Sequence, residues 1–294
     1  MQKSIKTSTF ATQFLYRVMR NILVLFLVAC LFASCGEYNN IQKTADYEYK
    51  YEVAKACFVK GEYTKAATLF GELLAVMKGT IRAEESLYLL AMSEYLGGDW
   101  EISSSYFKKY YQSYPKGRYV EHARYYAGKA LFDGTTDPRL DQANTLYAIE
   151  EFQNFLDYYP YTSLKSQTQE MIFALQDKLV EKEYGTAKLY YDLGTYVGNC
   201  SYGGSNYEAC IVTAENALRD FPYANAVRRE SFAILILRAK YRLAQQSVEE
   251  KRLERYRDAI DEYYGFVNEH PESKYMEEAR KIFATADKIV KNSK

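Results

Sequence analysis

The residue with the clearest potential for chemistry is Cys35, whose sulfur stands where a bacterial cell could attach a lipid. Residues 21–34, NILVLFLVACLFAS, form an uncharged apolar run that follows Arg17 and Arg20. A basic flank, a short apolar stretch and small residues before a cut site are typical of a secretory signal. The run is shorter than the roughly 20 apolar residues of a comfortable transmembrane helix. The letters ASC at 33–35 indicate a lipobox, the signal-peptidase II site at which diacylglycerol is joined to the cysteine sulfur.

We therefore predict a signal peptide over 1–34 and a lipidated tether over 35–46. Two or more acyl chains anchor a protein stably without a spanning helix, so a triacylated Cys35 would hold the chain on a membrane. Gly36 follows the cysteine, where an aspartate would oppose sorting to the outer membrane in many Gram-negative bacteria. No dense acidic run follows as an export tag for the outer surface. The expected location is the outer membrane, with the protein facing the periplasm.

Two alternatives stay open at this terminus. Cys30 fits the lipobox letters better, because Phe32 replaces the usual aliphatic residue three positions before Cys35. We favour Cys35 because a cut before Cys30 would leave the apolar letters LFAS on the mature chain. Met19 is an alternative start to Met1, since MRNILVLFLVACLFASC is a complete lipoprotein signal by itself.

The other chemistry-bearing residues form no recognisable catalytic or metal-binding pattern. The two histidines, His122 and His270, belong to no HExxH motif, and the chain contains neither GxxxxGK[ST] nor GxSxG. Cys57 falls on an apolar helix face and is predicted to be core, and a bridge between Cys200 and Cys210 stays open. We predict that the protein is not an enzyme and holds neither a cofactor nor a metal.

The composition favours a globular protein without affinity for nucleic acid. Hydrophobic residues make up 48% and charged residues 26% of the 294 positions, and five prolines and 15 glycines are few for this length. Removing residues 1–34 takes away four basic groups and no acidic one, which leaves 34 basic and 38 acidic side chains. A weakly acidic mature chain has no global field that would attract nucleic acid.

The elements that position these residues are repeated helix pairs. Four of the five prolines close the same phrase, at Tyr114-Pro115, Tyr159-Pro160, Phe221-Pro222 and His270-Pro271. Twelve residues before each proline stands a small residue, namely Ser103, Ala148, Cys210 and Ala259. Eight before stand Phe107, Phe152, Ala214 and Tyr263, and five before stand Tyr110, Phe155, Ala217 and Phe266. Spacings of four and three residues place these side chains on one helix face, and proline ends the helix.

The preceding helices complete a tetratricopeptide (TPR) pattern. Gly61 and Gly98 stand between paired helices, and the units around them superpose with an offset of 37 residues. Five approximate copies cover 47–80, 84–117, 120–162, 184–224 and 228–273, with a helix over 163–182 joining the halves and a capping helix over 274–291. We predict an all-α, right-handed superhelical solenoid of about five TPR-type helix pairs with a C-terminal capping helix. Its predicted domains are 47–182 (repeats one to three and the joining helix) and 183–294 (repeats four and five and the cap).

Insertions and tyrosines are the candidates for binding surfaces. Residues 133–144 and 198–206 interrupt the third and fourth repeats, and insertions in a solenoid fall on one rim and often carry function. Tyrosine pairs occur at 110–111, 125–126, 158–159, 190–191 and 263–264. Adjacent helical residues point about 100° apart, so one tyrosine of each pair can pack while the other faces solvent. Two interpretations remain, a purely structural role or a groove lined by tyrosines that binds peptides.

Several phrases of the chain resemble the BamD family, lipoprotein subunits of the β-barrel assembly (Bam) machinery, in the version found in the Bacteroidetes lineage. These are CGEY, DYEYKYEVAKACFVKGEYTKAATLF, the insertion ARYYAGKALFDGTTDPRLDQA, LRDFP and ESKYMEEAR. The likeness covers essentially all of 35–294. It implies a lipid-anchored scaffold whose partners are the periplasmic domain of the barrel-forming Bam subunit and unfolded outer-membrane proteins.

The resemblance also implies a division of labour. Repeats one and two (47–117) would meet unfolded outer-membrane chains, and repeats four and five (184–273) would dock on the barrel-forming subunit. Arg228 and Arg229, at the start of the fifth repeat, are the predicted charged contacts of that docking face. The alternative is a generic TPR envelope lipoprotein, such as a SusD-like glycan-binding protein or a cell-envelope scaffold.

Overall fold

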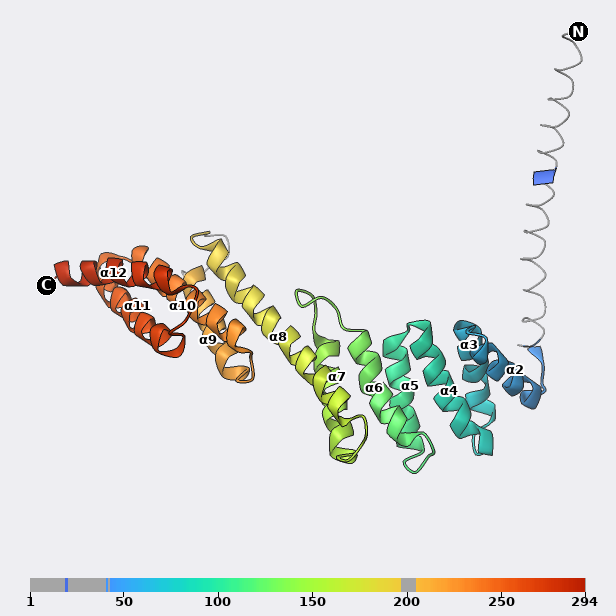
Figure 1. Ribbon diagram of the computed structural model, residues 1–294. Helices are drawn as coiled ribbons and strands as arrows, with labels where there is room; N and C mark the ends of the chain where they lie inside the picture. The colour runs from blue at the N-terminus through green and yellow to red at the C-terminus, as the bar shows by residue number, and fades with distance from the viewer. Residues whose placement is uncertain (1–18, 21–40, 42, 197–204, 294) are drawn as a thin grey trace, which may run out of the picture. The chain divides into compact units, whose positions relative to one another are not determined.

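The computed structural model describes residues 19–20, 41, 43–196 and 205–293, and its regular structure over these ranges is helical, with no strand. Eleven helices follow one another (Figure 1). They are α2 (Tyr47–Val59), α3 (Tyr63–Val76), α4 (Ile81–Gly97), α5 (Trp100–Ser113), α6 (Val120–Asp133), α7 (Ala143–Tyr158), α8 (Lys165–Leu193), α9 (Asn206–Asp220), α10 (Ala226–Gln245), α11 (Glu249–Glu269) and α12 (Met276–Asn292). The all-α prediction is confirmed. The predictions at Cys30, Cys35 and Cys200 lie outside the described residues.

Contacts divide the chain into two compact units, the first ending at Ala123 and the second beginning at Arg124. In the first unit, α2 packs on α3, α3 on α4, and α4 on α5. In the second unit, each helix from α7 to α12 packs on the next. This packing of consecutive helix pairs confirms the TPR-like solenoid.

The repeat phrase forms the same backbone turn at all four prolines. The residue before each proline leaves the helical conformation, as proline requires of its predecessor. Its φ and ψ angles are −128° and 66° at Tyr114, −128° and 67° at Tyr159, −120° and 66° at Phe221, and −131° and 60° at His270. His270 therefore plays the same structural part as the aromatic residues at the equivalent positions.

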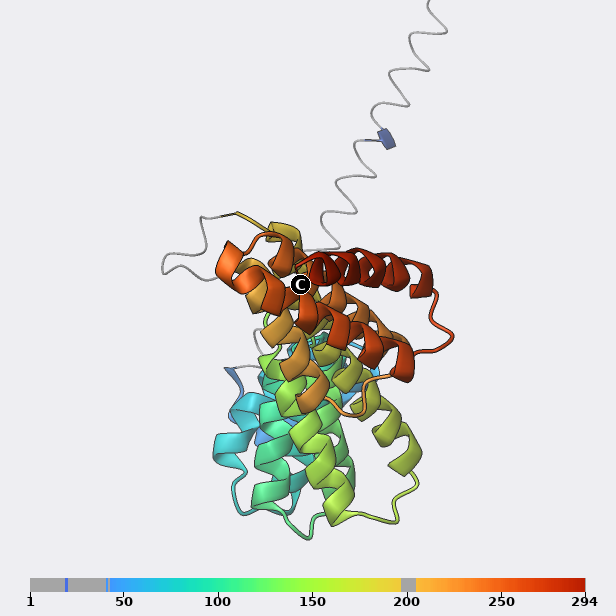
Figure 2. The same ribbon diagram turned by 90° about the vertical axis from the view of Figure 1, so that its left-hand side faces the viewer.

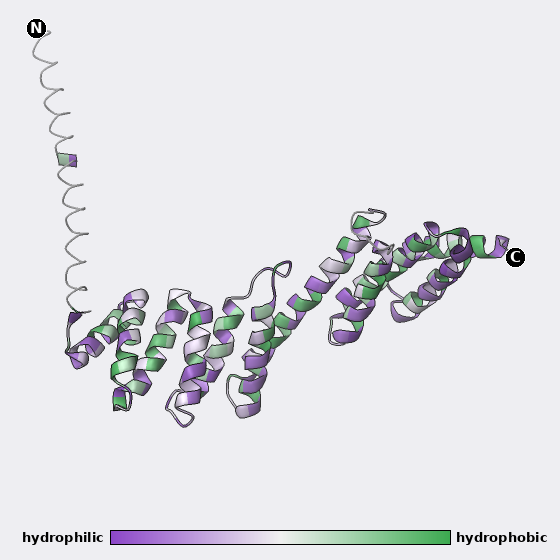
Figure 3. Ribbon diagram, turned by 180° about the vertical axis from the view of Figure 1, so that it is seen from behind, coloured by the Kyte–Doolittle hydropathy of each residue, from purple (hydrophilic) through white to green (hydrophobic). Residues whose placement is uncertain are grey.

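Side chains at the predicted small and aromatic positions form the cores. Hydrophobic and hydrophilic residues alternate along the helices (Figure 3). In the first unit Ser103, Phe107 and Tyr110 are fully buried. At the turns, Gly61 and Gly98 have φ angles of +80° and +88°, a left-handed conformation that glycine adopts without steric cost. The predicted turn glycines are thus confirmed.

Helix α8 is longer than the pattern indicated. The joining helix predicted at 163–182 and the start of the fourth repeat form one continuous helix of 29 residues. Its first half contributes Leu175 to the core that contains Phe152 and Phe155, and its second half contributes Val180 and Ala187 to the core of α9 and α10. No proline stands at the junction to end the helix. The predicted domain boundary after residue 182 stays a prediction and falls inside this helix.

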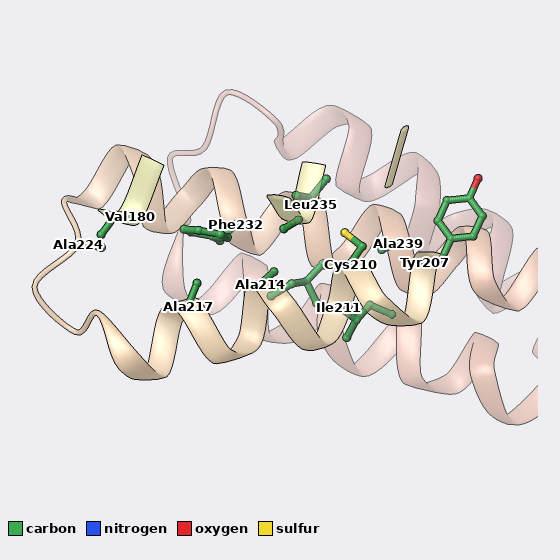
Figure 4. Packing of buried hydrophobic residues seen from close by; sticks show 12 residues of the cluster. Val180, Tyr207, Cys210, Ile211, Ala214, Ala217, Ala224, Phe232, Leu235 and Ala239 are labelled. Atoms are coloured by element: carbon green, nitrogen blue, oxygen red, sulfur yellow. The ribbon is translucent and has the colours of Figure 1, made fainter. Parts of the chain in front are cut away.

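In the core between α8, α9 and α10, small side chains of α9 face larger ones of α10. Figure 4 shows the Phe232 ring of α10 beside Ala214 and Ala217 of α9, with Cys210 farther along the same helix. Burial raises the pKa of the Cys210 thiol to about 12. Small residues on α9 let α10 approach closely, as the TPR pattern predicts.

The C-terminal helix covers the last apolar face. Helix α12 lies alongside α11, and both views show it in dark red against its neighbour (Figures 1 and 2). Its Ala279 and Ile282 pack in the cluster that holds Phe266 of α11, and Ala286 packs with Tyr256. The predicted capping helix at 274–291 is confirmed.

A close approach in the third repeat gives a test of this packing. A Cβ atom on Gly128 of α6 would lie 2.7 Å from Cδ1 of the buried Phe152 ring in α7. We expect Gly128→Ala to lower the free energy of unfolding by about 1–2 kcal/mol, because overpacking outweighs the ~0.5–1 kcal/mol that alanine adds to a helix. Gly185→Ala is the matched control, since a Cβ on this α8 residue meets nothing within 4 Å and should stabilise. Urea unfolding of both variants measures the difference, and equal stabilities would contradict the close approach.

Candidate protein-binding surfaces

The two predicted docking residues, Arg228 and Arg229, lie in the first turn of α10, and contacts within the fold hold the Arg228 side chain in place. The Asn225 side chain caps the helix by accepting the backbone N–H of Arg228 at 2.9 Å. The Arg228 guanidinium forms an ion pair with Glu181 of α8 and lies 4.4 Å from the centre of the Tyr184 ring. Its charge is therefore already matched within the second unit. Arg229 is partly exposed, so it is the freer of the two for a partner.

Two basic residues of α10 that the sequence analysis did not single out make stronger links. Arg238 donates two hydrogen bonds to Glu278 of α12, at 2.7 and 2.6 Å. This pairing holds the pKa of Glu278 below its usual value. Lys240 lies 2.6 Å from Glu262 of α11 and 3.4 Å from Glu215 of α9. Burial lowers the pKa of Lys240, but the two carboxylates outweigh this and the pKa is raised, so the amine stays charged. The signal in the sequence was the presence of Arg238, Lys240 and Arg242 inside the largely apolar run SFAILILRAKYRLA.

Helices α9, α10 and α11 enclose a groove of about 660 Å³, which we call the α9–α11 groove. Its carboxylates are Glu208, Asp258, Asp261, Glu262 and Glu269. Its basic residues are Lys240 and Arg255, and Arg255 donates a hydrogen bond to Ser247 at 2.7 Å. Ile211, Val212 and Leu243 supply its apolar surface. The groove combines an acidic excess with apolar surface, in which Val212 is exposed, Leu243 is half-buried and Ile211 is buried.

A second groove, of about 280 Å³, occupies the equivalent place in the first unit, between α3, α4 and α5. Thr64, Thr68 and Gly71 line it from α3, and Glu94 and Asp99 stand at its other side. Burial, and then the charge of Asp99, raise the pKa of Glu94. This groove is polar and carries fewer charges than the α9–α11 groove.

The paired tyrosines contribute more to the hydrophobic cores than to the lining of either groove. Tyr110 is fully buried and Tyr125 is 5% exposed, whereas Tyr158 and Tyr264 are 64% and 57% exposed. The other members of these pairs, Tyr111, Tyr126, Tyr159 and Tyr263, are half-buried, so in each pair one ring is more deeply packed than its neighbour. Tyr106 lines the groove of the first unit, and no tyrosine lines the α9–α11 groove. Within the described part of the chain, the α9–α11 groove and its first-unit counterpart are therefore not tyrosine-lined troughs.

Glu84 and Glu85 of α4 hold the first unit together. Glu84 accepts hydrogen bonds from the Tyr110 hydroxyl at 2.6 Å and from the backbone N–H of Arg118 at 2.7 Å. Glu85 accepts one from the Tyr51 hydroxyl at 2.6 Å, which lowers the pKa of the Glu85 carboxyl. Burial, then the bond to Glu85, raises the pKa of Tyr51. These partners stand 26 to 34 residues away in sequence, so the spacing along one helix does not reveal them.

The insertion at 133–144 is an ordered rim. The buried Gln142 side chain donates to the Asp137 carbonyl at 2.8 Å and accepts from Thr145 at 2.7 Å. Lys178 of α8 donates to Thr135 at 2.6 Å, which ties the rim to α8. Most of the insertion at 198–206 lies outside the described residues. Its last residue, Asn206, donates to the carbonyls of Gly194 and Tyr196, at 3.1 and 2.9 Å.

The described residues hold no helix long and apolar enough to cross a bilayer. They also hold no cluster of three or more His, Cys, Asp or Glu side chains arranged for a metal ion.

Comparison with models of known families identifies the family to which the chain belongs. Residues 44–201 match the family model YfiO, described as outer membrane lipoprotein. The match starts just before α2 and extends past α8, which is more than half of the chain. No curated protein matches the sequence. With a TPR-like fold and the BamD-like phrases noted above, the chain belongs to the YfiO family of outer membrane lipoproteins, which are of the BamD type.

Proposed function

We propose that this protein is a lipid-anchored, periplasm-facing scaffold subunit of the outer-membrane β-barrel assembly machinery. In this role it binds the barrel-forming subunit and unfolded outer-membrane proteins, and it performs no catalysis of its own. The observation that carries the proposal is the YfiO match over residues 44–201. The likeness of the sequence to BamD on both sides of that match supports it.

Helices α2 to α5 are the proposed contact for unfolded outer-membrane chains. Several large apolar side chains of this unit are exposed near helix ends, including Val59 (84%) and Ile81 (96%). Leu96 and Trp100 flank the α4–α5 turn and are 43% and 39% exposed. Exposed apolar side chains of this kind can contact the alternating apolar residues of an outer-membrane chain that has not yet folded into its β-barrel.

The second unit is the proposed docking face for the barrel-forming subunit. Arg229 lies near the start of α10 and is partly exposed, while Arg228 braces α10 against α8. In this arrangement Arg229 contacts the partner and Arg228 holds the helix that presents it. The proposed lipid on Cys35 keeps both surfaces close to the membrane where barrels are inserted.

Affinity purification from detergent-solubilised membranes tests the proposed function. We expect the tagged chain to co-purify the barrel-forming Bam subunit, identified by mass spectrometry. Arg229→Glu should reduce its recovery, and Arg219→Glu, an exposed arginine of α9 paired with its neighbour Asp220, is the charge-matched control. Recovery of a polysaccharide-uptake transporter instead would support the SusD-like alternative, and recovery of neither would overturn the assembly role.

A further inference from the structure

The two walls of the α9–α11 groove are each a stripe along one helix. Glu208, Ile211, Val212 and Glu215 succeed one another on α9 at spacings of three, one and three residues. Asp258, Glu262, Gly265 and Glu269 succeed one another on α11 at spacings of four, three and four. Residues at such spacings share a helix face. Each wall therefore presents carboxylates in a row, with apolar or open positions between them.

A cationic side chain of the protein itself already sits between these walls. Helix α10 forms the bottom of the groove, between the two walls. Its Lys240 forms ion pairs with Glu262 on the α11 wall and Glu215 on the α9 wall. Asp258 and Glu269, which extend the same α11 stripe on either side of Glu262, are exposed. Val212 is 51% exposed, and a Cβ on Gly265 would meet nothing within 4 Å, so the space beside the carboxylates is open.

The acidic character belongs to this groove and not to the repeat architecture. In the first unit, the α3 stripe Thr64, Ala67, Thr68 and Gly71 occupies the place of the α9 stripe. It carries no charge where α9 carries Glu208 and Glu215. The lining of the α9–α11 groove has five carboxylates and two basic side chains, while Lys240 and Arg255 already have partners within the fold.

We propose that the α9–α11 groove binds an extended segment of a partner protein that carries lysine or arginine residues beside apolar ones. Asp258 and Glu262 are about 6 Å apart along the helix axis, at 1.5 Å per residue. Alternate side chains of an extended strand repeat about every 6.6 Å, so one basic side chain can meet Asp258 while the next shares the Glu262 carboxylate with Lys240. The intervening apolar side chains then reach Ile211, Val212 and Leu243. This inference rests on the proposed function, because it names the chemistry of what repeats four and five bind.

Fluorescence anisotropy with a defined probe tests the proposal. The lipidated full chain in nonionic detergent is titrated against labelled seven-residue peptides, whose five central residues span about 16 Å, the length of the α11 wall from Asp258 to Glu269. The probe is Gly-Arg-Leu-Arg-Leu-Arg-Gly, and its counterparts replace every arginine with glutamate or every leucine with serine. We expect the arginine–leucine peptide to bind at least about tenfold more tightly than either counterpart, and to weaken as salt rises.

Two charge-matched variants locate the binding. Glu208→Gln with Asp258→Asn removes one carboxylate from each wall and should weaken binding at least about fivefold. Glu150→Gln with Asp157→Asn removes the same charge from exposed positions of α7 and should leave it unchanged. Equal loss in both variants, or equal binding of the glutamate peptide, would overturn the proposal. Equal binding of the serine peptide would show a site for charge alone and would also overturn it.

The outcome is separable from that of the purification experiment. If the peptide binds as expected but no barrel-forming subunit is recovered, the groove stands and the assembly role fails. If the subunit is recovered but the peptide does not bind, the assembly role stands and the groove is not its contact.

Discussion

Replacing Phe232 with alanine is expected to lower the free energy of unfolding by about 3–5 kcal/mol. The ring is fully buried in the second unit and meets Tyr184 edge-on, with centroids 5.4 Å apart. Its neighbours Ala214 and Ala217 on α9 are small and cannot extend to refill the space. The cost therefore includes both the lost burial of the ring and the cavity left behind. Urea unfolding followed by circular dichroism measures it.

Phe173→Ala is the matched control for this substitution. Phe173 lies on α8 in the same unit and is 61% exposed. Its removal should change the stability by no more than about 0.5 kcal/mol, as for surface positions in general. A similar loss in both variants would mean that the α8–α9–α10 core is not packed as described.

Replacing Cys35 with alanine is expected to release most of the protein from the membrane fraction. Cys35 lies outside the described residues, so this prediction comes from the sequence. Each buried CH₂ of an acyl chain contributes about 0.8 kcal/mol, so the loss of several chains removes nearly all membrane affinity. Fractionation after a high-salt wash separates lipid anchoring from retention by partners. Incorporation of labelled palmitate into the chain gives a second readout.

Cys30→Ala distinguishes the two candidate lipidation sites. This variant should keep both its label and its place in the membrane fraction, because Cys30 belongs to the signal peptide that we predict over 1–34. If Cys30→Ala loses the palmitate label and Cys35→Ala keeps it, the lipid is attached at Cys30. Label retained by both single variants would contradict lipidation at either cysteine alone.

The sequence was sufficient for the features that recur along the chain. The offsets from the four prolines predicted the buried face that holds Phe107 and Phe152, because tetratricopeptide positions have one structural role each. The capping helix followed from the need to cover the last apolar face. Between the third and fourth repeats the tetratricopeptide pattern is weaker, and there the predicted helix boundary differs from the structure. Helix α8 continues through the junction expected after residue 182 because no residue there ends a helix.

The binding surfaces depended on contacts that sequence spacing does not reveal. Tyr110 was predicted as a packed ring, and it is one. Its hydroxyl also donates to Glu84 and accepts the backbone N–H of Tyr119 at 3.0 Å, which fixes the turn after the helix. Similarly, the stripe that begins at Glu208 is readable on α9, but α11 faces it only once α10 lies between them. Such pairings need the three-dimensional course of the chain.

Because α8 is one continuous helix of 29 residues, two neighbouring cores share a single structural member. In a simple repeat array, each unit can open by losing only the interface to its neighbour. Here, melting the α8 half around Leu175 interrupts the same helix that supplies Ala187 to the next core. The third and fourth repeats are therefore coupled in their opening, and local unfolding that starts in one is carried into the other. Lys178 of α8 is hydrogen-bonded to the rim at 133–144. A partner that binds α9, α10 and α11 would stabilise α8, and it would therefore also reduce local unfolding of this rim.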